Sequence, residues 1–439
     1  MVMKREINLM NVKGSYDYSP EEQRIRYFIQ DTLRRIFEEF GYKPLETPIL
    51  CYYDMLAGKY DESNDLLNEI YKLSDQGERE LGLRYDLTVP FAKYIALKKD
   101  IRLPFKRFEI GKVFRDGPVK PGRDREFLQC DVDVVGLSES LIEAELLSLW
   151  LKGYDALGID VYIKYNNRNL IRGLIEEFVE CDEDTVNKFV TVVDKMDKLS
   201  REEILDELTK LGIENGKALQ IFECFELDLD AMCEKFKDNG NDTLVRGLDE
   251  VVALKETLEG IGISEYCKFA PSLARGQDYY TGNVFEVYAK NGELSCSLGG
   301  GGRYDNMITD FIDDGNVYPA VGVSFGLSTI YEILKSRVEA KNSALTDVLV
   351  VPLGTECASL RLANTLRDMS YRVEVDMSGR KLKKSFETAD RENIPYIIVL
   401  GEDEVASQKC KVKDMRTKNE YEISLDNLEE IRDILFPDR

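Results

Sequence analysis

The chain has 439 residues, 43% apolar and 32% charged, so we expect a globular protein of two or three domains rather than one compact core. It contains no histidine, which excludes every mechanism that needs a protein imidazole as base, nucleophile or metal ligand. The formal net charge of −23 argues against indiscriminate binding to a polyanion and leaves only local basic patches for a nucleic acid.

The first part of the chain predicts a helix followed by strands. Apolar residues recur at helical spacing over residues 20–41, after a Ser-Pro pair that is typical of helix starts. Residues 43–50 predict a strand that leads into loops. The segment 110–136 predicts a strand, a basic loop and a second strand, so we expect long antiparallel strands joined by that loop.

The later part predicts an inserted helical region and a separate domain. Residues 168–262 become rich in Glu, Asp, Lys and Leu with helical periodicity, and strand-like segments resume at 283–289 and 295–298. The glycine run 299–302 lacks P-loop spacing and favours close backbone packing. Beyond a polar linker near 340–344, strand and helix patterns alternate, which predicts an α/β domain with a largely parallel sheet.

Cysteine usage and hydropathy indicate the compartment. Nine cysteines are scattered singly without a C-x-x-C pair, which indicates reduced, mostly buried thiols. No stretch approaches the roughly 20 apolar residues that span a bilayer, and the N-terminal MVMKREINLM lacks the apolar core of a secretion signal. We therefore expect a cytoplasmic protein without membrane contact.

Charged side chains gather in the predicted strand-loop-strand segment. Its strands and loop contain Arg115, Lys120, Arg123 and Arg125 beside Gln129, Asp131 and Asp133. Guanidinium groups on a loop are suited to a polyphosphate because they bind phosphate oxygens bidentately, and strand alternation places residues 129, 131 and 133 on one face. Alternating charges on a solvent-facing ribbon explain the same pattern equally well.

Two other segments contain candidate binding residues. LARGQDYYTGNVFE places Arg275, Asp278, Tyr279 and Tyr280 within six residues, although neighbouring tyrosines on a strand more often serve packing. LRYDLTVPFAKY contains Asp86 and Thr88, which suit a turn and helix cap as well as a ligand site. Neither segment decides its role by itself.

Taken in order, these segments resemble one family. GSYDYSP, ETPIL, LRYDLTVPFAKY, FRDGPVKPGRDREFLQCDVDVVG, LARGQDYYTGNVFE and GGGGRYDN follow the order and approximate spacing of histidyl-tRNA synthetases, which are class II aminoacyl-tRNA synthetases. The resemblance covers essentially the whole chain. It implies an α+β fold, with a class II catalytic domain on an antiparallel sheet over residues 1–335, a helical insertion at about 168–262 near the tRNA acceptor stem, and an anticodon-binding α/β domain over 345–439.

The resemblance also implies the reaction, the ligands and the assembly. Histidine would be activated with ATP and Mg²⁺ and then transferred to tRNA(His) by a homodimer built partly through the Pro48 segment. Activation is an attack of a carboxylate that is already ionised, so catalysis is chiefly positioning and charge stabilisation and needs no histidine base. We expect no protein-bound metal site.

Roles are implied residue by residue by the matching motifs. The histidine site would comprise Asp86, Thr88 and Gln129 for the ammonium, Asp133 and Tyr280 for the imidazole, and Tyr279 beside them. Arg115 and Arg275 would be catalytic and would bind ATP together with Arg123. A carboxylate and a hydroxyl can satisfy the two nitrogens of a neutral imidazole, which other amino acids would leave unpaired.

A basic segment of the last domain is the implied tRNA contact. Arg380, Lys381, Lys383 and Lys384 begin a predicted helix and give an acidic protein a local phosphate-facing patch. A solvated helix face is the alternative for this segment.

Two positions depart from the family pattern. The family's third motif normally ends in an acidic residue and an arginine that contacts the γ-phosphate, where this chain has Ser328 and Thr329. The hairpin has Gly117 where an acidic residue commonly contacts the adenine end. An alternative function is therefore a paralogue that binds histidine or tRNA as a sensor or regulatory subunit without efficient aminoacylation.

Overall fold

The computed structural model describes residues 8–58, 65–98, 100–119, 123–180, 182–196, 199–275, 279–292, 294, 296–338 and 344–435. The chain divides into two compact units, the first running to residue 333 without the segment 18–23, and the second comprising that segment and residues 334–439. Lys120 and Asp278, which the sequence singled out, lie outside the described residues.

An eight-stranded sheet organises the first unit, in the order β1-β5-β6-β11-β10-β9-β7-β8. Its strands are β1 (Lys43–Pro44), β5 (Phe105–Phe114), β6 (Glu126–Val135), β7 (Val161–Asn167), β8 (Cys267–Phe269), β9 (Asn283–Ala289), β10 (Gly299–Arg303) and β11 (Ala320–Gly326). All pairings are antiparallel except β1–β5 and β7–β8 at the two edges. The predicted antiparallel sheet with its long hairpin is therefore confirmed.

The glycine run is itself a strand of this sheet. Residues 299–303 form β10, whereas residues 296–298, within a segment predicted to be a strand, precede it in irregular structure. A smaller sheet beside the main one has the order β2-β4-β3. Its strands are β2 (Leu50–Tyr52), β3 (Lys72–Ser74) and β4 (Glu80–Leu83).

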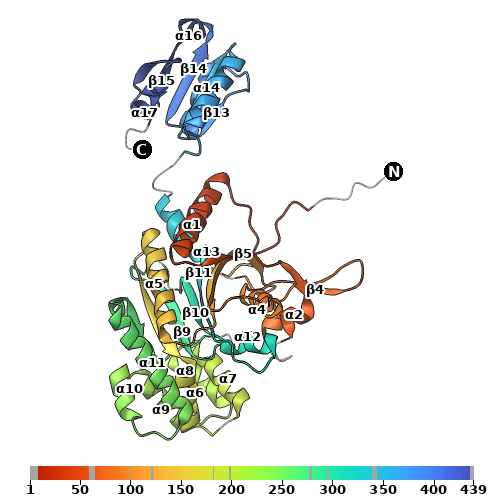
Figure 1. Cartoon of the computed structure of the whole chain (residues 1–439), viewed down its shortest axis with the longest axis vertical. Coiled ribbons are helices and arrows are strands. Elements are labelled where there is room, and N and C mark those ends of the chain that lie inside the picture. Colours follow the sequence, from red (N-terminus) through yellow and green to blue (C-terminus); the bar gives the residue numbers. More distant parts are fainter. Residues whose placement is uncertain are drawn as a thin grey trace. The chain divides into compact units, whose positions relative to one another are not determined.

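Helices α1 and α5 pack against one face of the main sheet (Figure 1). The ring of Phe37 in α1 lies 5.2 Å from that of Phe108 in β5 and 5.6 Å from that of Phe325 in β11, and Trp150 of α5 meets Phe325 edge-on. Because side chains alternate along a strand, the residues beside Phe325 face the opposite side. The helices around the sheet are α1 (Pro20–Glu39), α2 (Tyr53–Ala57), α3 (Asp65–Asn68), α4 (Thr88–Leu97), α5 (Ser140–Ala156), α12 (Asp305–Ile312) and α13 (Leu327–Val338).

A cluster of helices follows β7 and gathers beside the sheet (Figure 1, yellow to green). It comprises α6 (Arg168–Phe178), α7 (Glu183–Val193), α8 (Arg201–Lys210), α9 (Asn215–Phe225), α10 (Leu229–Lys235) and α11 (Asp242–Gly260), followed by a short 3-10 turn, η1 (Ser264–Tyr266). Gly173 of α6 and Gly247 of α11 let the two helix backbones touch, because a Cβ at either position would lie within 2.4 Å of the other helix.

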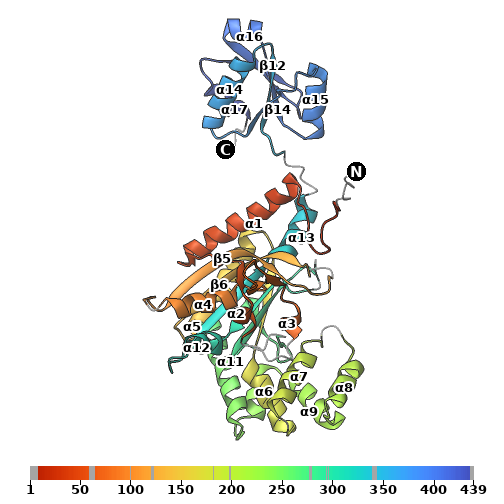
Figure 2. The same cartoon turned by 90° about the vertical axis from the view of Figure 1, so that its right-hand side faces the viewer.

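The second unit is a five-stranded sheet in the order β13-β12-β14-β15-β16. Its strands are β12 (Val348–Leu353), β13 (Val373–Val375), β14 (Tyr396–Gly401), β15 (Lys409–Asp414) and β16 (Glu420–Ser424), and its helices are α14 (Glu356–Asp368), α15 (Leu382–Arg391), α16 (Glu402–Ser407) and α17 (Glu430–Leu435). Figure 2 shows α14 and α17 on one side of the sheet and α15 on the other, and each side has its own apolar core.

Two expectations for this unit need correction. The sheet is mixed rather than largely parallel, because only β13, β12 and β14 run parallel, while β15 and β16 form an antiparallel hairpin. The basic helix begins at Leu382, so Arg380 and Lys381 precede it.

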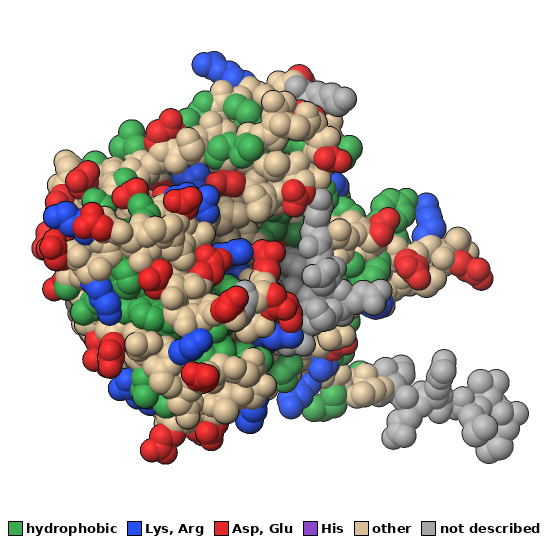
Figure 3. Space-filling model, turned by 90° about the horizontal axis from the view of Figure 1, so that it is seen from below, with side chains coloured by type: hydrophobic (Ala, Val, Ile, Leu, Met, Phe, Trp, Pro, Cys, Tyr) green, Lys and Arg blue, Asp and Glu red, His purple; other side chains and the backbone are tan. Residues whose placement is uncertain are grey.

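Acidic and basic side chains mix on the surface. Figure 3 shows red acidic and blue basic groups interspersed over the face seen from below. Along the parts of the chain that the structure describes, no helix is both long and apolar enough to cross a membrane.

Candidate functional site

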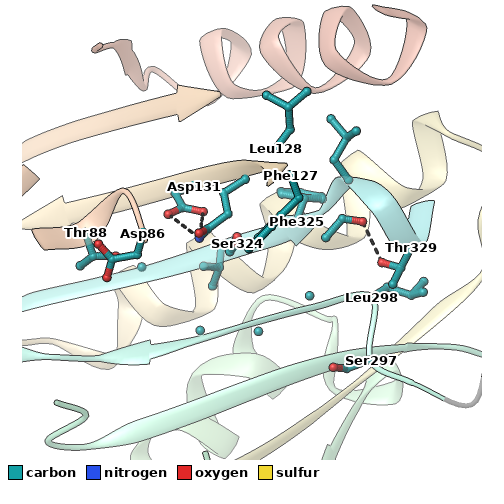
Figure 4. Close-up of a pocket in the computed structure, with 18 of the residues that line it drawn as sticks. Asp86, Thr88, Phe127, Leu128, Asp131, Ser297, Leu298, Ser324, Phe325 and Thr329 are labelled. Carbon is teal, nitrogen blue, oxygen red and sulfur yellow. Dashed lines mark hydrogen bonds between the residues drawn. The ribbon is translucent and has the colours of Figure 1, made fainter. Parts of the chain in front are cut away.

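A cavity of about 270 Å³ lies over the face of the main sheet that α1 and α5 leave free (Figure 4). Nine side chains to which the sequence analysis gave roles line it. They are Asp86, Thr88, Arg115, Arg123, Gln129, Asp133, Arg275, Tyr279 and Tyr280. The fold therefore brings together segments that lie up to about two hundred residues apart in the sequence.

The pairing register of β6, β11 and β10 determines which residues form the floor of the cavity. On β6, residues 129, 131 and 133 stand opposite Gly326, Ser324 and Gly322 of β11, and residues 300 and 302 of β10 continue the same rows. A Cβ on Gly322 would lie 2.0 Å from the Asp133 carboxylate, and one on Gly302 would lie 2.8 Å from the Tyr280 ring. Glycine at these positions lets the neighbouring side chains lie across the sheet.

Two neighbouring side chains hold the Asp133 carboxylate in place. Arg107 of β5, which is fully buried, places Nη2 2.8 Å from Asp133 Oδ2, and the Tyr304 hydroxyl donates to Oδ1. Burial raises the pKa of Asp133, whereas Arg107 and the hydrogen bond from Tyr304 lower it. Each carboxylate oxygen has two lone pairs, so Asp133 can still accept a hydrogen bond from a ligand.

Asp86 serves as a helix cap and also faces the cavity. Its Oδ1 accepts from the backbone N–H of Val89 in the first turn of α4, at 3.1 Å. Among the described residues, Asp86 Oδ2 and Gln129 Oε1 have no hydrogen-bond partner. Burial raises the pKa of Asp86 to about 6. Two acceptors are thus available for a ligand that carries donors.

Three arginines border the cavity, and each has a partner in the protein. Arg275 forms an ion pair with Glu286 of β9, and Arg123 forms one with Glu69. Arg115 donates from Nε to the carbonyl of Tyr85 at 3.1 Å. A bound polyphosphate would meet the guanidinium groups already oriented, in competition with the two glutamates.

Two other arginines of the quoted motifs, Arg125 and Arg303, do not line the cavity. Arg125 donates to the carbonyl of Gly117 and faces Asp116 at the hairpin turn. Arg303 is buried in an ion pair with Glu143 of α5, 2.7 Å away, and does not line the cavity. Arg303 is therefore not positioned to contact a phosphate bound in the cavity.

The residues that the sequence analysis expected to depart from the family pattern occupy different places. Ser328 and Thr329 begin α13 and line the cavity, and the Thr329 hydroxyl donates to the carbonyl of Gly326 at 2.7 Å. Gly117 lies at the hairpin turn under the Glu69 carboxylate, where a Cβ would come within 2.9 Å of Oε1. The four basic residues proposed for tRNA are exposed in the second unit.

Sequence reasoning missed the groups that hold the site residues. Tyr304 and Glu286 lay in segments quoted for the resemblance but received no role, and Arg107 gave no signal because a buried arginine in a strand looks like a surface residue in sequence. Only pairing across strands places Arg107 opposite Asp133.

Comparisons with known proteins agree over nearly the whole chain. A family model described as histidyl-tRNA synthetase matches residues 14–330, and one described as an anticodon binding domain matches residues 347–432. Histidine–tRNA ligase 1 of Bacillus cereus (strain ATCC 10987 / NRS 248) is 42% identical over 426 residues, which are 97% of each chain.

Solved structures share the fold. The histidyl-tRNA synthetase from Nostoc sp. PCC 7120 has a TM-score of 0.80 at 28% identity and covers 98% of this chain and 100% of its own. An ATP phosphoribosyltransferase regulatory subunit/histidyl-tRNA synthetase from Bacillus halodurans C has a TM-score of 0.76 at 22% identity, covering 91% of this chain and 100% of its own, and indicates the fold alone.

Proposed function

The chain belongs to the histidyl-tRNA synthetase family, and from this premise we propose how a histidine–tRNA ligase works in the cavity of the first unit. The main observation behind the proposal is that Asp133 and Tyr280, which can pair with the two nitrogens of an imidazole, line the same cavity as Arg115 and Arg275. That combination suits an amino acid and a nucleotide bound side by side.

Histidine binds between β6 and the start of α4. Asp86, Thr88 and Gln129 receive the ammonium, and the unpaired acceptors on Asp86 and Gln129 support this role. Asp133 and Tyr280 pair with the two imidazole nitrogens, with Tyr279 packed against Tyr280 at 4.7 Å between ring centres. A site built to satisfy both nitrogens rejects amino acids that leave those buried groups unpaired.

ATP binds across the arginines with its Mg²⁺ as part of the substrate. Arg115 contacts the α-phosphate, Arg123 the outer phosphates, and Arg275 both the histidine carboxylate and the α-phosphate. The carboxylate attacks the α-phosphorus, pyrophosphate leaves, and histidyl-adenylate forms. A cation between the two reacting anions reduces their repulsion and stabilises the charge that develops, so Arg115 and Arg275 are the catalytic residues.

Transfer to tRNA(His) involves the second unit. Arg380, Lys381, Lys383 and Lys384 form its phosphate-facing patch, and the anticodon-domain match over residues 347–432 supports this assignment. We assign residues 1–335 to catalysis, with the helices at about 168–262 as an insertion, and 345–439 to the anticodon. Exposed apolar side chains next to Pro48, those of Ile49, Leu50 and Tyr52, support a homodimer through that segment.

Regulation without catalysis is not favoured as the function. The relative named as a histidine–tRNA ligase matches this chain along 97% of its length, whereas the likeness to the regulatory-subunit structure concerns the fold. Histidine-dependent exchange of pyrophosphate into ATP, followed by charging of tRNA(His), tests the ligase directly. Histidine binding without exchange under any condition would support the regulatory alternative.

We propose that Thr329 stands where the family's γ-phosphate arginine normally lies. The lack of that arginine weakens ATP binding. We expect Thr329→Arg to lower the Michaelis constant for ATP about tenfold, since one added charged contact contributes on the order of 1.4 kcal/mol. Thr329→Val is the control, because it removes only the hydrogen bond to Gly326. An unchanged constant in the arginine variant would show that Thr329 is not the weak point.

Gly300 keeps the space that Arg275 needs. An added Cβ would lie 2.5 Å from the guanidinium carbon, so we expect Gly300→Ala to displace Arg275 and to lower pyrophosphate exchange about 10²-fold. The fold should persist, because the displaced group is the end of a flexible side chain. Gly216→Ala, which adds a methyl in open space on α9, is the matched control. Equal exchange rates in both variants would refute the placement of Arg275.

A further inference from the structure

Asp131 is a third buried carboxylate on the lining of the cavity, besides Asp86 and Asp133, and the roles proposed above do not use it. It stands on β6 between Gln129 and Asp133, opposite Ser324 of β11, and points into the cavity with only 4% of its surface exposed (Figure 4). Burial disfavours the charged form of an acid, so a carboxylate buried this deeply destabilises the fold. We therefore expect Asp131 to serve a function.

Asp131 determines which end of the Gln129 amide is free. Gln129 Nε2 donates to both carboxylate oxygens of Asp131, at 3.3 Å each (dashed lines in Figure 4). The donor end of the amide is therefore occupied, and Oε1 is left buried without a partner among the described residues. With the opposite orientation, the amide would present two N–H donors instead.

This orientation is the one that an ammonium requires. An ammonium has three donors and no acceptor, so it needs oxygens around it and is repelled by an N–H. Gln129 Oε1, Asp86 Oδ2 and the Thr88 hydroxyl supply three oxygens on the lining of the cavity. The amide of Gln129 contributes only while its nitrogen is held away from the substrate.

We propose that Asp131 is a positioning residue for substrate histidine, which orients the Gln129 amide so that its carbonyl oxygen accepts from the ammonium. This inference rests on the proposed function, because it takes histidine as the ligand. It adds a specificity-determining acid to a site whose other acids contact the substrate directly. The nearby negative charge also favours a cationic group over a neutral one.

The protonation of Asp131 should be coupled to histidine binding. Burial, and then the neighbouring Asp133, raise the pKa of Asp131 to about 7, while Arg107 and a hydrogen bond with Ser324 oppose the rise. Protonated Asp131 can donate to Gln129 Oε1, which allows the amide to turn its N–H groups toward the substrate. The titratable and charged groups facing Asp131 are Asp133 on β6, Arg107 and Glu109 on β5, Asp86 before α4, Tyr280 before β9 and Tyr304 after β10. Histidine should therefore release a proton from Asp131 when it binds near pH 6.5.

Two variants separate orientation from charge. Asp131→Leu can accept nothing from Gln129, whereas Asp131→Asn can still accept through its amide oxygen. We expect the leucine variant to raise the dissociation constant for histidine about 10- to 100-fold and the asparagine variant to raise it less, since hydrogen bonds to charged groups have effects of that size. The Michaelis constant for ATP should not change in either variant.

A double-mutant cycle tests whether Asp131 acts through Gln129. Calorimetric titration with histidine alone, without ATP, measures affinity in the wild type, in Asp131→Leu, in Gln129→Met and in the double variant. If Asp131 positions Gln129, its substitution has little further effect once residue 129 is methionine. Full additivity of the two effects would overturn the proposal, and so would an unchanged affinity in Asp131→Leu.

Proton release and folding provide independent readouts. Calorimetric titrations at pH 6.5 in buffers of different ionisation enthalpy should show that Asp131→Asn releases fewer protons than the wild type when it binds histidine. Equal proton release would overturn the coupling.

The raised pKa of Asp131 means that the wild type loses stability as pH rises from about 4 to about 7, so Asp131→Asn should melt no lower than the wild type at pH 8. Absence of histidine-dependent exchange in a wild type that still binds histidine would count against the proposed function and leave this test intact.

Discussion

Arg275→Ala should reduce histidine-dependent pyrophosphate exchange about 10³-fold, which we expect to be the largest single effect at this site. Removing one preorganised donor from a developing charge typically costs 10²- to 10³-fold, and Arg275 is proposed to contact both reacting groups. Its loss also removes the cationic partner of the Glu286 carboxylate, since the two form an ion pair in the structure. Initial rates of exchange at saturating ATP and histidine measure the effect.

Two further variants make this result specific. Arg275→Lys keeps the charge but not the bidentate fork, so we expect an intermediate loss of about 10- to 100-fold. Arg172→Ala removes an arginine that pairs with Glu176 and Glu183 outside the cavity, and surface pairs of this kind contribute little. Exchange by Arg275→Ala at the level of Arg172→Ala would exclude Arg275 from catalysis.

Asp133→Asn should lower kcat/KM for histidine about 10²-fold while the Michaelis constant for ATP stays the same. The substitution keeps the shape of the side chain and its ability to accept from Tyr304, but it removes the charge that we propose receives an imidazole N–H. Steady-state exchange with histidine and ATP varied separately distinguishes the two constants. An equal rise in both would point to general damage instead of lost imidazole recognition.

The stability of the Asp133→Asn variant has to be measured separately from its activity. Arg107 is fully buried and loses its closest anionic partner, leaving Glu109 at 3.6 Å, and breaking a buried pair can cost about 3–5 kcal/mol. The assays should therefore run well below the melting temperature of the variant. Tyr280→Phe removes only the hydroxyl that we propose pairs with the other imidazole nitrogen, so it should weaken histidine binding without that loss of stability.

Much of the fold was predictable because its signals are local. The long hairpin follows from two alternating runs around a basic loop, and β9 follows from the apolar segment 283–289. Local patterns were less informative where the pairing partner determines the structure. The hairpin β15–β16 was missed, and the strand expected at 295–298 instead begins at Gly299, because glycine has no strand propensity of its own.

The sequence predicted which residues line the candidate site, but not which residues hold them in place. Nine pocket residues could be named because each lies in a motif whose spacing resembles the family. Their partners could not, because an ion pair such as Arg107 with Asp133, or Arg303 with Glu143, joins strands and helices whose register no single segment encodes.

By itself, the sequence determined the family, the absence of any imidazole chemistry from the protein, and nine residues that line the cavity, because these depend on residue types at short spacing. Only the tertiary structure decided that glycines on β10 and β11 form the floor, that Arg303 turns away from the cavity, and that Asp131 holds the Gln129 amide. The physical reason is that a side chain's partner is set by the packing of strands and helices distant in sequence, and that packing is a property of the whole sheet.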